Sequence, residues 1–123
     1  MSRQDQIWNR ACLEGGGTEP AVGDAALASV LLAHGLVMNG GVVHALECLS
    51  SAQVAAAIAG FKYFGLTTAA YVFEQPPDAS AEQHLNHMYW QAVPNDEVLA
   101  HAFRIKLVAS PEAFAPTSSS THV

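Results

Sequence analysis

Two apolar runs joined by the tripeptide Asn39-Gly40-Gly41 restrict the fold of this chain more than any other feature. In the first run, apolar side chains and one histidine recur at the three- and four-residue intervals that place them on one face of an α-helix. The residues of this face are Leu27, Val30, Leu31, His34, Val37 and Met38. Because Leu32 and Leu36 add apolar area to the other faces, the pattern predicts a central helix that its neighbours nearly surround.

The tripeptide Asn39-Gly40-Gly41 predicts the end of this helix, because asparagine and glycine accept the left-handed conformation of a closing turn. Helical spacing resumes after it with Val43, Leu46 and Leu49, so two helices meet here side by side or at a sharp angle. Adjacent glycines also let a ligand or a partner backbone approach, which makes the tripeptide and the following His44 a candidate binding site. A purely structural turn explains the same residues, and both interpretations stay open.

Residues with capping side chains divide the rest of the chain into further helices. The predicted caps are Ser2, Ser50, Thr67, Ser80 and Asn95. Glycine or proline closes these segments, since neither favours the interior of a helix. The start of the central helix stays open between Thr18 and Asp24.

Apolar stripes along these helices indicate the core. The predicted stripes are Ile7, Trp8, Ala11 and Cys12 in the first helix, Val54, Ile58 and Phe61 in an alanine-rich helix, and Val98, Ala102, Ile105 and Ala109 in the last. The alanines around Ile58 are small enough to let a neighbouring helix approach closely. We predict an all-α fold, a single compact domain of about six helices over residues 1–116, followed by a disordered Ser/Thr-rich tail over residues 117–123.

Composition and charge exclude several functional classes. Half of the residues are apolar and 13% are charged, which is typical of a folded domain. Eleven acidic and five basic residues give a net charge of -6. We therefore expect neither a nucleic acid nor an anionic membrane as ligand, since both require clustered Lys and Arg. The near-apolar run from Ala25 to Met38 is expected to be too short to cross a bilayer, and it contains His34.

The cysteines and the N-terminal residues indicate the cellular compartment. Cys12 and Cys48 both fall at apolar helix positions, which predicts buried thiols, and two cysteines are too few for a disulfide scaffold. Residues 2–6 are polar, so no signal peptide is expected. These features predict a reduced, cytoplasmic protein.

Six histidines raise the question of a metal site. His84 and His87 are three residues apart, and His44 precedes Glu47 by the same interval, so each pair could supply two ligands from one helix face. The Glu-x-x-His pattern of di-iron carboxylate proteins and the His-Glu-x-x-His pattern of zinc proteases are both absent. We therefore expect no metal and no cofactor. His34, on the apolar stripe, is expected to be buried and hydrogen-bonded to a carbonyl or carboxylate.

The chain resembles a bacterial family of uncharacterised helical proteins that is known mainly through a DNA-mimic protein, which binds a transcription factor. The resemblance covers roughly residues 27–116 and is carried by the apolar helix before Asn39-Gly40-Gly41, by the glycine-ended segment 61–65, and by Tyr89 followed by Pro94-Asn95-Asp96. It implies a helical fold and supplies no catalytic residue. Family members commonly place aromatic residues after the two glycines, where this chain has Val42, Val43 and His44. Its acidic residues are scattered along the chain, so DNA mimicry is not transferred to it.

These observations predict a non-enzymatic interaction protein that binds a macromolecular partner through an acidic and aromatic surface. The aromatic residues Tyr71, Phe73, Tyr89 and Trp90 flank Pro76-Pro77 and form either core or an exposed interface. The negative charge favours a protein partner with a basic patch, and a homodimer through the alanine-rich helix stays open. The alternatives are a small-molecule-binding domain with a pocket beside the central helix, and a metal-dependent enzyme that uses the histidines.

Overall fold

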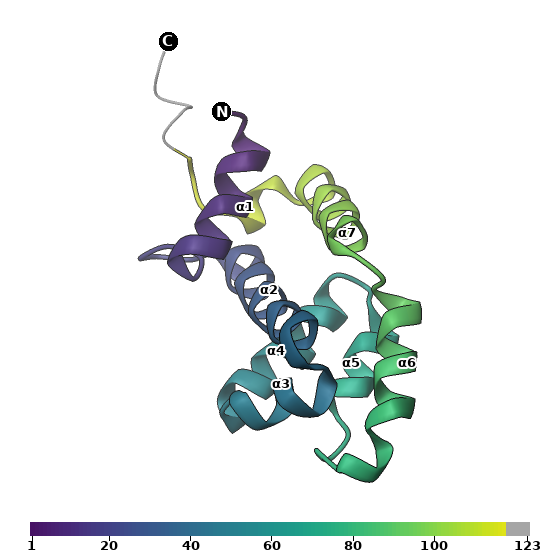
Figure 1. The fold of residues 1–123 in the computed structure, drawn as a ribbon. Coiled ribbons are helices and arrows are strands. Elements are labelled where there is room, and N and C mark those ends of the chain that lie inside the picture. The colour runs from purple at the N-terminus through teal and green to yellow at the C-terminus, as the bar shows by residue number, and fades with distance from the viewer. Residues whose placement is uncertain (118–123) are drawn as a thin grey trace.

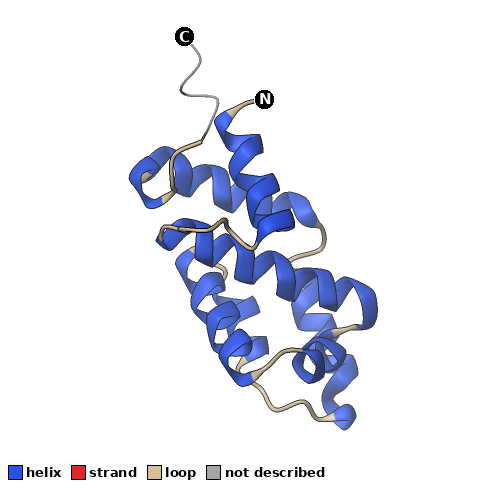
Figure 2. Cartoon of the chain, turned by 90° about the vertical axis from the view of Figure 1, so that its left-hand side faces the viewer, coloured by secondary structure: helices blue, strands red, loops and turns tan. Residues whose placement is uncertain are grey.

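In the computed structural model, which describes residues 1–117, helices are joined by short loops, and these residues include no strand (Figures 1 and 2). The α-helices are α1 (Arg3–Glu14), α2 (Val22–Gly40), α3 (Val42–Cys48), α4 (Ser51–Tyr63), α5 (Thr67–Phe73), α6 (Glu82–Ala92) and α7 (Asp96–Ala109). Two short 3-10 segments, η1 (Ala79–Ala81) and η2 (Pro111–Ala113), complete the described chain. The predicted all-α fold is confirmed, with helices close in number to those expected.

Helix α2 runs through the middle of the molecule and packs against α1, α3 and α4 (Figure 1). Four members of the predicted stripe, Leu27, Val30, His34 and Val37, are buried there. Leu32 and Met38 are exposed, so α2 keeps one open side and is less enclosed than the sequence predicted. The most extensive packing is against α4, where Ala57 and Gly60 are buried. Of the alanines expected to let a helix approach, Ala57 lies in this contact, while Ala55, Ala56 and Ala59 are exposed.

By length and composition alone, α2 is apolar enough to cross a membrane, with 19 residues and a mean hydropathy of 1.4. The expectation that this run is too short was wrong, because the helix extends beyond the uninterrupted apolar residues at both ends. The core helix of a helical domain passes the same test, and 44% of this stretch is buried against the rest of the described chain.

The junction of α2 and α3 depends on one glycine of the tripeptide. Gly41 has φ +93° and ψ 176°, a backbone conformation that essentially only glycine adopts, whereas Asn39 and Gly40 still belong to α2. The first amide of α3, Val42 N–H, donates a 2.8 Å hydrogen bond to Asn86 Oδ1 of α6. A residue 44 positions along the chain therefore caps α3, and the predicted turn is confirmed at Gly41.

Replacing Gly41 by asparagine is expected to lower the free energy of unfolding by about 1–3 kcal/mol, because a side chain forces the backbone out of this region. Gly15→Asn is the matched control. Gly15 has φ 59° and ψ 24°, a left-handed conformation that asparagine tolerates, and its surroundings are open, so a change of only a few tenths of a kcal/mol is expected. Urea denaturation of both variants measures the difference, and equal losses would contradict it.

Three of the predicted helix caps are confirmed, at Ser2, Ser50 and Asn95. In the capping box of α4, Ser50 Oγ accepts a 3.1 Å bond from Gln53 N–H, and Gln53 Oε1 accepts a 2.9 Å bond from Ser50 N–H. Ala21 is the N-cap residue of α2, so the helix starts between Thr18 and Asp24, the two starting points left open by the sequence.

Two predicted caps were wrong. Thr67 is already the first residue of α5, where no side chain caps the helix. Ser80 does not begin α6, because the carboxylate of Asp78 caps η1 instead and accepts bonds from the Ser80 amide at 2.9 Å and hydroxyl at 2.8 Å. Asp78, two residues earlier, therefore accepts from both the amide and the hydroxyl of Ser80, and Ser80 lies within η1 and not at the N-cap of α6.

Arg10 and Asp24 hold the C-terminal segment of the described chain against α1 and the start of α2. The buried carboxylate of Asp24 accepts hydrogen bonds from Arg10 Nη2 at 2.8 Å, from Ala21 N–H at 3.0 Å and from Ala115 N–H at 2.7 Å. Arg10 also donates to the carbonyls of Ala115 at 3.1 Å and Pro116 at 2.9 Å. The next residue, Thr117, is buried and does not belong to an open tail, while residues 118–123 of the predicted tail lie outside the described residues.

The cysteine prediction was also wrong, because Cys12 and Cys48 are both exposed. Ile7 and Ala11 take the buried face of α1, and Cys12 lies one residue past that face. Cys48 ends the short helix α3, whose buried face lies on the opposite side. Partial burial, and then the negative charge of Asp96, raise the pKa of the Cys12 thiol, so it stays protonated at neutral pH.

Candidate functional site

The face that helix α7 turns inward is only in part the one that its sequence predicted. Leu99 and Phe103 are buried. The centroid of the Phe103 ring lies 5.9 Å from that of Trp8 and 5.4 Å from that of Phe114. Both stripes satisfy the helical period, and the one with the largest side chain packs against the aromatic rings of α1 and the C-terminal segment. Of the predicted stripe, Val98 and Ala102 are half-buried beside this face and pack against the core, whereas Ile105 and Ala109 are exposed.

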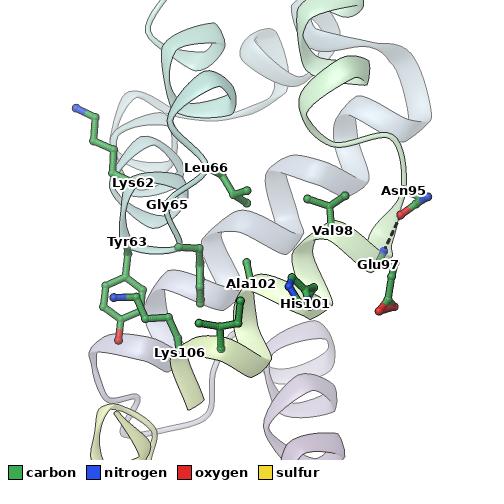
Figure 3. A pocket seen from close by; sticks show the side chains of 12 residues that line it. Lys62, Tyr63, Gly65, Leu66, Asn95, Glu97, Val98, His101, Ala102 and Lys106 are labelled. Carbon is green, nitrogen blue, oxygen red and sulfur yellow. Dashed lines mark hydrogen bonds between the residues drawn. The ribbon is translucent and has the colours of Figure 1, made fainter. Parts of the chain in front are cut away.

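Val98, Ala102 and Ile105 of this stripe form one wall of a surface groove of about 830 Å³. The opposite wall is the turn between α4 and α5 (Figure 3). The α4–α5 side contributes Lys62, Tyr63, Phe64, Gly65 and Leu66, and the α7 side contributes Asn95, Glu97, Val98, His101, Ala102, Ile105 and Lys106. We call this hollow the α4–α7 groove. The side chain of Ile105 is 56% exposed, so the groove presents apolar area to solvent.

Local backbone structure places both walls. Gly65, with φ +76°, reverses the chain after α4, while Leu66 N–H donates to Phe61 O at 2.8 Å and Gly65 N–H donates to Lys62 O at 3.0 Å. This arrangement is that of a glycine-ended helix, and it brings Leu66 to the side facing α7. Asn95 Oδ1 accepts a 3.0 Å bond from Glu97 N–H and so fixes the start of α7 at the other wall.

Three of the chain's five basic residues, Lys62, Arg104 and Lys106, gather around the α4–α7 groove. Lys62 pairs with Glu74 at 3.2 Å, and Arg104 pairs with Glu97 at 2.6 Å. The ammonium of Lys106 lies 4.4 Å above the centre of the Tyr63 ring. Partial burial, followed by the charge of Glu112, raises the pKa of Tyr63, so its hydroxyl remains a donor at neutral pH.

A chain of hydrogen bonds, buried at Tyr89 and His34 and open to solvent at Asp96, holds the start of α7 against the core. His34 Nδ1 lies 2.8 Å from the Tyr89 hydroxyl, and His34 Nε2 lies 2.8 Å from Asp96 Oδ1. Burial, and then the charge of Asp96, raise the pKa of Tyr89 far above its usual value, so the hydroxyl stays protonated and has a hydrogen to share with Nδ1. Nε2–H then donates to Asp96, which confirms the predicted buried histidine with a carboxylate partner. Because Tyr89 is 0% exposed, this chain is a structural link between α2, α6 and α7.

Replacing Tyr89 by phenylalanine is expected to lower the free energy of unfolding by about 1–3 kcal/mol, because the buried Nδ1 of His34 loses its donor. Tyr71→Phe removes the same atom from a side chain that is 50% exposed, and a change within about 0.5 kcal/mol is expected. Thermal melts of the two variants test the pair. A Tyr89→Phe protein as stable as the parent would show that the hydrogen bond contributes nothing.

The binding site predicted at Asn39, Gly40, Gly41 and His44 lies at another part of the molecule. A β-carbon on Gly40 would lie 2.5 Å from Cγ of His44, and one on Gly41 would lie 3.2 Å from the side chain of Asn86. The space beside both glycines is therefore occupied by the protein's own side chains, while Asn39 points to solvent. A ligand at the tripeptide stays a prediction, and these contacts favour the structural interpretation.

The other sequence candidates are spread over the surface. His84 and His87 are exposed on α6, and residues 1–117 contain no group of three His, Cys, Asp or Glu side chains placed to hold a metal ion. The aromatic group near Pro76-Pro77 divides, with Phe73 and Tyr89 in the core and Tyr71 and Trp90 exposed. Sequence reasoning missed the α4–α7 groove, although Val98, Ala102 and Ile105 were recognised as one helix face.

Comparison of the chain with models of protein families, with curated proteins and with solved structures found no match. The resemblance to the DNA-mimic family stays a prediction. The function is therefore inferred from the geometry of the α4–α7 groove.

Proposed function

We propose that this protein binds a protein partner in the α4–α7 groove and has no catalytic activity of its own. The observation that carries the proposal is the apolar stripe of Val98, Ala102 and Ile105, which faces Leu66 and Tyr63 across an open hollow (Figure 3). Apolar area with a charged rim is the usual anatomy of an interface. Lys62, Glu97 and Lys106 supply that rim.

The charges of the chain affect such a partner during its approach and again at contact. The net charge of -6 favours a partner with a basic patch during approach, and this long-range effect is seen mainly in the association rate. At contact, the residues of the groove itself decide the affinity. We further propose that neither a nucleic acid nor a membrane is the ligand, because the net charge is -6 and the chain has only five basic residues. A cytoplasmic location is proposed from the polar residues 2–6 and the two cysteines.

A small-molecule ligand is the second candidate, because a hollow of about 830 Å³ is within the size range of ligand pockets. The groove supports this less well, since its apolar wall on α7 lies along the surface and Ile105 remains largely accessible. A ligand pocket usually buries most of the ligand. The homodimer proposed from the alanine-rich helix would use a different surface, on α4.

Substituting Ile105 by glutamate is expected to weaken partner capture roughly tenfold or more, because a charge placed on the apolar wall must lose its hydration when the interface closes. Val108→Glu is the matched control: Val108 is 83% exposed on the same helix and is not among the residues lining the groove. The effect is measured by affinity capture from cell extract with the parent protein, Ile105→Glu and Val108→Glu. A partner retained equally by both variants would place the interface outside the groove.

A further inference from the structure

We infer that the segment bound in the α4–α7 groove is an amphipathic α-helix of the partner protein, and that a carboxylate on its flank is received by Lys106. The inference rests on the proposed function and adds the chemistry of the occupant. It follows from the shape of the apolar wall, from the hydrogen-bonding needs of a bound backbone, and from the charges that remain unpaired around the groove.

The apolar wall has the spacing of a helix–helix contact. Val98, Ala102 and Ile105 lie four and three residues apart on α7 and extend over about 10 Å along its axis, or two helical turns. A bound helix would place apolar side chains of the same spacing against them. Ala102 is small, and the space beside Gly65 on the opposite wall is open, so a second helix can approach α7 closely.

Backbone hydrogen bonding selects a helix over an extended peptide. The described residues 1–117 contain no strand whose edge could pair with an extended segment. A peptide bound in extended form would therefore find no backbone partner for the N–H and C=O groups that it turns towards the groove, whereas a helix pairs these groups within itself. The partner segment is accordingly expected to be helical when bound.

The charges around the groove select an acidic flank. Glu97 is neutralised by Arg104 and Lys62 is paired with Glu74, at 2.6 and 3.2 Å. Within the described part of the chain, no carboxylate lies within 4.0 Å of the Lys106 ammonium, which lies instead over the Tyr63 ring. Lys106 therefore keeps donors for a ligand, and Figure 3 shows it at the groove beside Tyr63, while Lys62 extends away from the groove. A carboxylate is the protein group that best matches such an ammonium.

The test uses designed peptides of about 18 residues with leucines at helical spacing on one face. One peptide carries glutamates beside the apolar face, the second carries lysines at the same positions, and the third is the glutamate peptide with two central prolines that prevent a helix. Binding to the full chain is measured by fluorescence anisotropy at low salt. We expect the glutamate peptide to bind about tenfold more tightly than the lysine peptide, and the proline peptide to lose binding.

Variants of the protein test whether the preference for the glutamate peptide arises in the α4–α7 groove. Lys106→Gln should remove most of the advantage of the glutamate peptide, Lys62→Gln should change it little, and Ile105→Glu should weaken both helical peptides. Circular dichroism of each variant confirms that the fold is kept. Equal binding of the glutamate and lysine peptides, an advantage unchanged in Lys106→Gln, or full binding of the proline peptide would overturn the inference and leave the proposed function standing. Helical peptides that bind Ile105→Glu as well as the parent would overturn both.

Discussion

Replacing Arg10 by alanine is expected to lower the free energy of unfolding by about 3 kcal/mol, one of the two largest effects of a single substitution that we predict. The carboxylate of Asp24 is 1% exposed and would lose its one cationic partner within residues 1–117, the Arg10 guanidinium at 2.8 Å. A buried charge without a partner is far more costly than a missing surface ion pair. Because the Arg10 side chain is itself 18% exposed, we place the loss at the lower end of the range for buried pairs.

The loss should be specific to the pair. Arg3 binds the carbonyls of Pro111 and Phe114, at 3.1 Å each, but contacts no buried carboxylate, so Arg3→Ala is expected to be clearly milder. In the double variant Arg10→Ala with Asp24→Asn, the uncompensated charge disappears, and the loss should be smaller than the sum of the two single losses. Urea denaturation of the parent, the three single variants and the double variant gives these values. An Arg10→Ala loss below about 1 kcal/mol would show that the pair does not hold the C-terminal segment against α1 and α2.

Replacing Gly60 by valine is expected to lower the free energy of unfolding by about 3 kcal/mol, because α2 and α4 would have to separate. A β-carbon on Gly60 would lie 2.8 Å from the carbonyl oxygen of Ala26 and 2.9 Å from Cγ2 of Val30, and the first of these is backbone that cannot rotate away. Even Gly60→Ala should destabilise the protein, although alanine favours the helical state over glycine by about 1 kcal/mol.

Gly35→Ala is the control with the opposite sign. Gly35 lies in the middle of α2, and a β-carbon there would meet no atom within 4 Å. Only the helical preference of alanine acts at this position, so a gain of about 1 kcal/mol is expected. Thermal melts of the two alanine variants test the packing of α2 on α4 directly. A Gly60→Ala protein that is more stable than the parent would contradict the close approach of these helices.

Local features of this fold could be predicted from the sequence because a few neighbouring residues determine them. The capping box of Ser50 and Gln53 needs only residues three positions apart, and Gly41 adopts a positive φ because glycine has no β-carbon. The periodicity of α2 identified Leu27, Val30, His34 and Val37 as core for the same reason. These predictions depend on helix geometry alone.

The links that fix the tertiary structure join residues far apart in the sequence. Asp24 and Ala115 are 91 residues apart, and His34 and Asp96 are 62 apart, so no local pattern could pair them. The face of α7 was predicted only in part: Val98 and Ala102 are half-buried, but Phe103 is buried more deeply because it packs against Trp8 and Phe114. The α4–α7 groove is a consequence of that packing. A usable signal was present, since Lys62, Arg104 and Lys106 gather in the two segments that line it.

Site-specific photo-cross-linking in the source cell tests the central claim most directly, because it reports which surface a partner touches without disturbing the interface by a charge. A photoreactive phenylalanine derivative is placed at Ile105 in one protein and at Val108 in another, two exposed positions on the same helix. Binding in the α4–α7 groove predicts a discrete cross-linked protein from position 105 and little or none from position 108. Equal cross-linking from both positions, or from position 108 alone, would contradict the groove as the binding site.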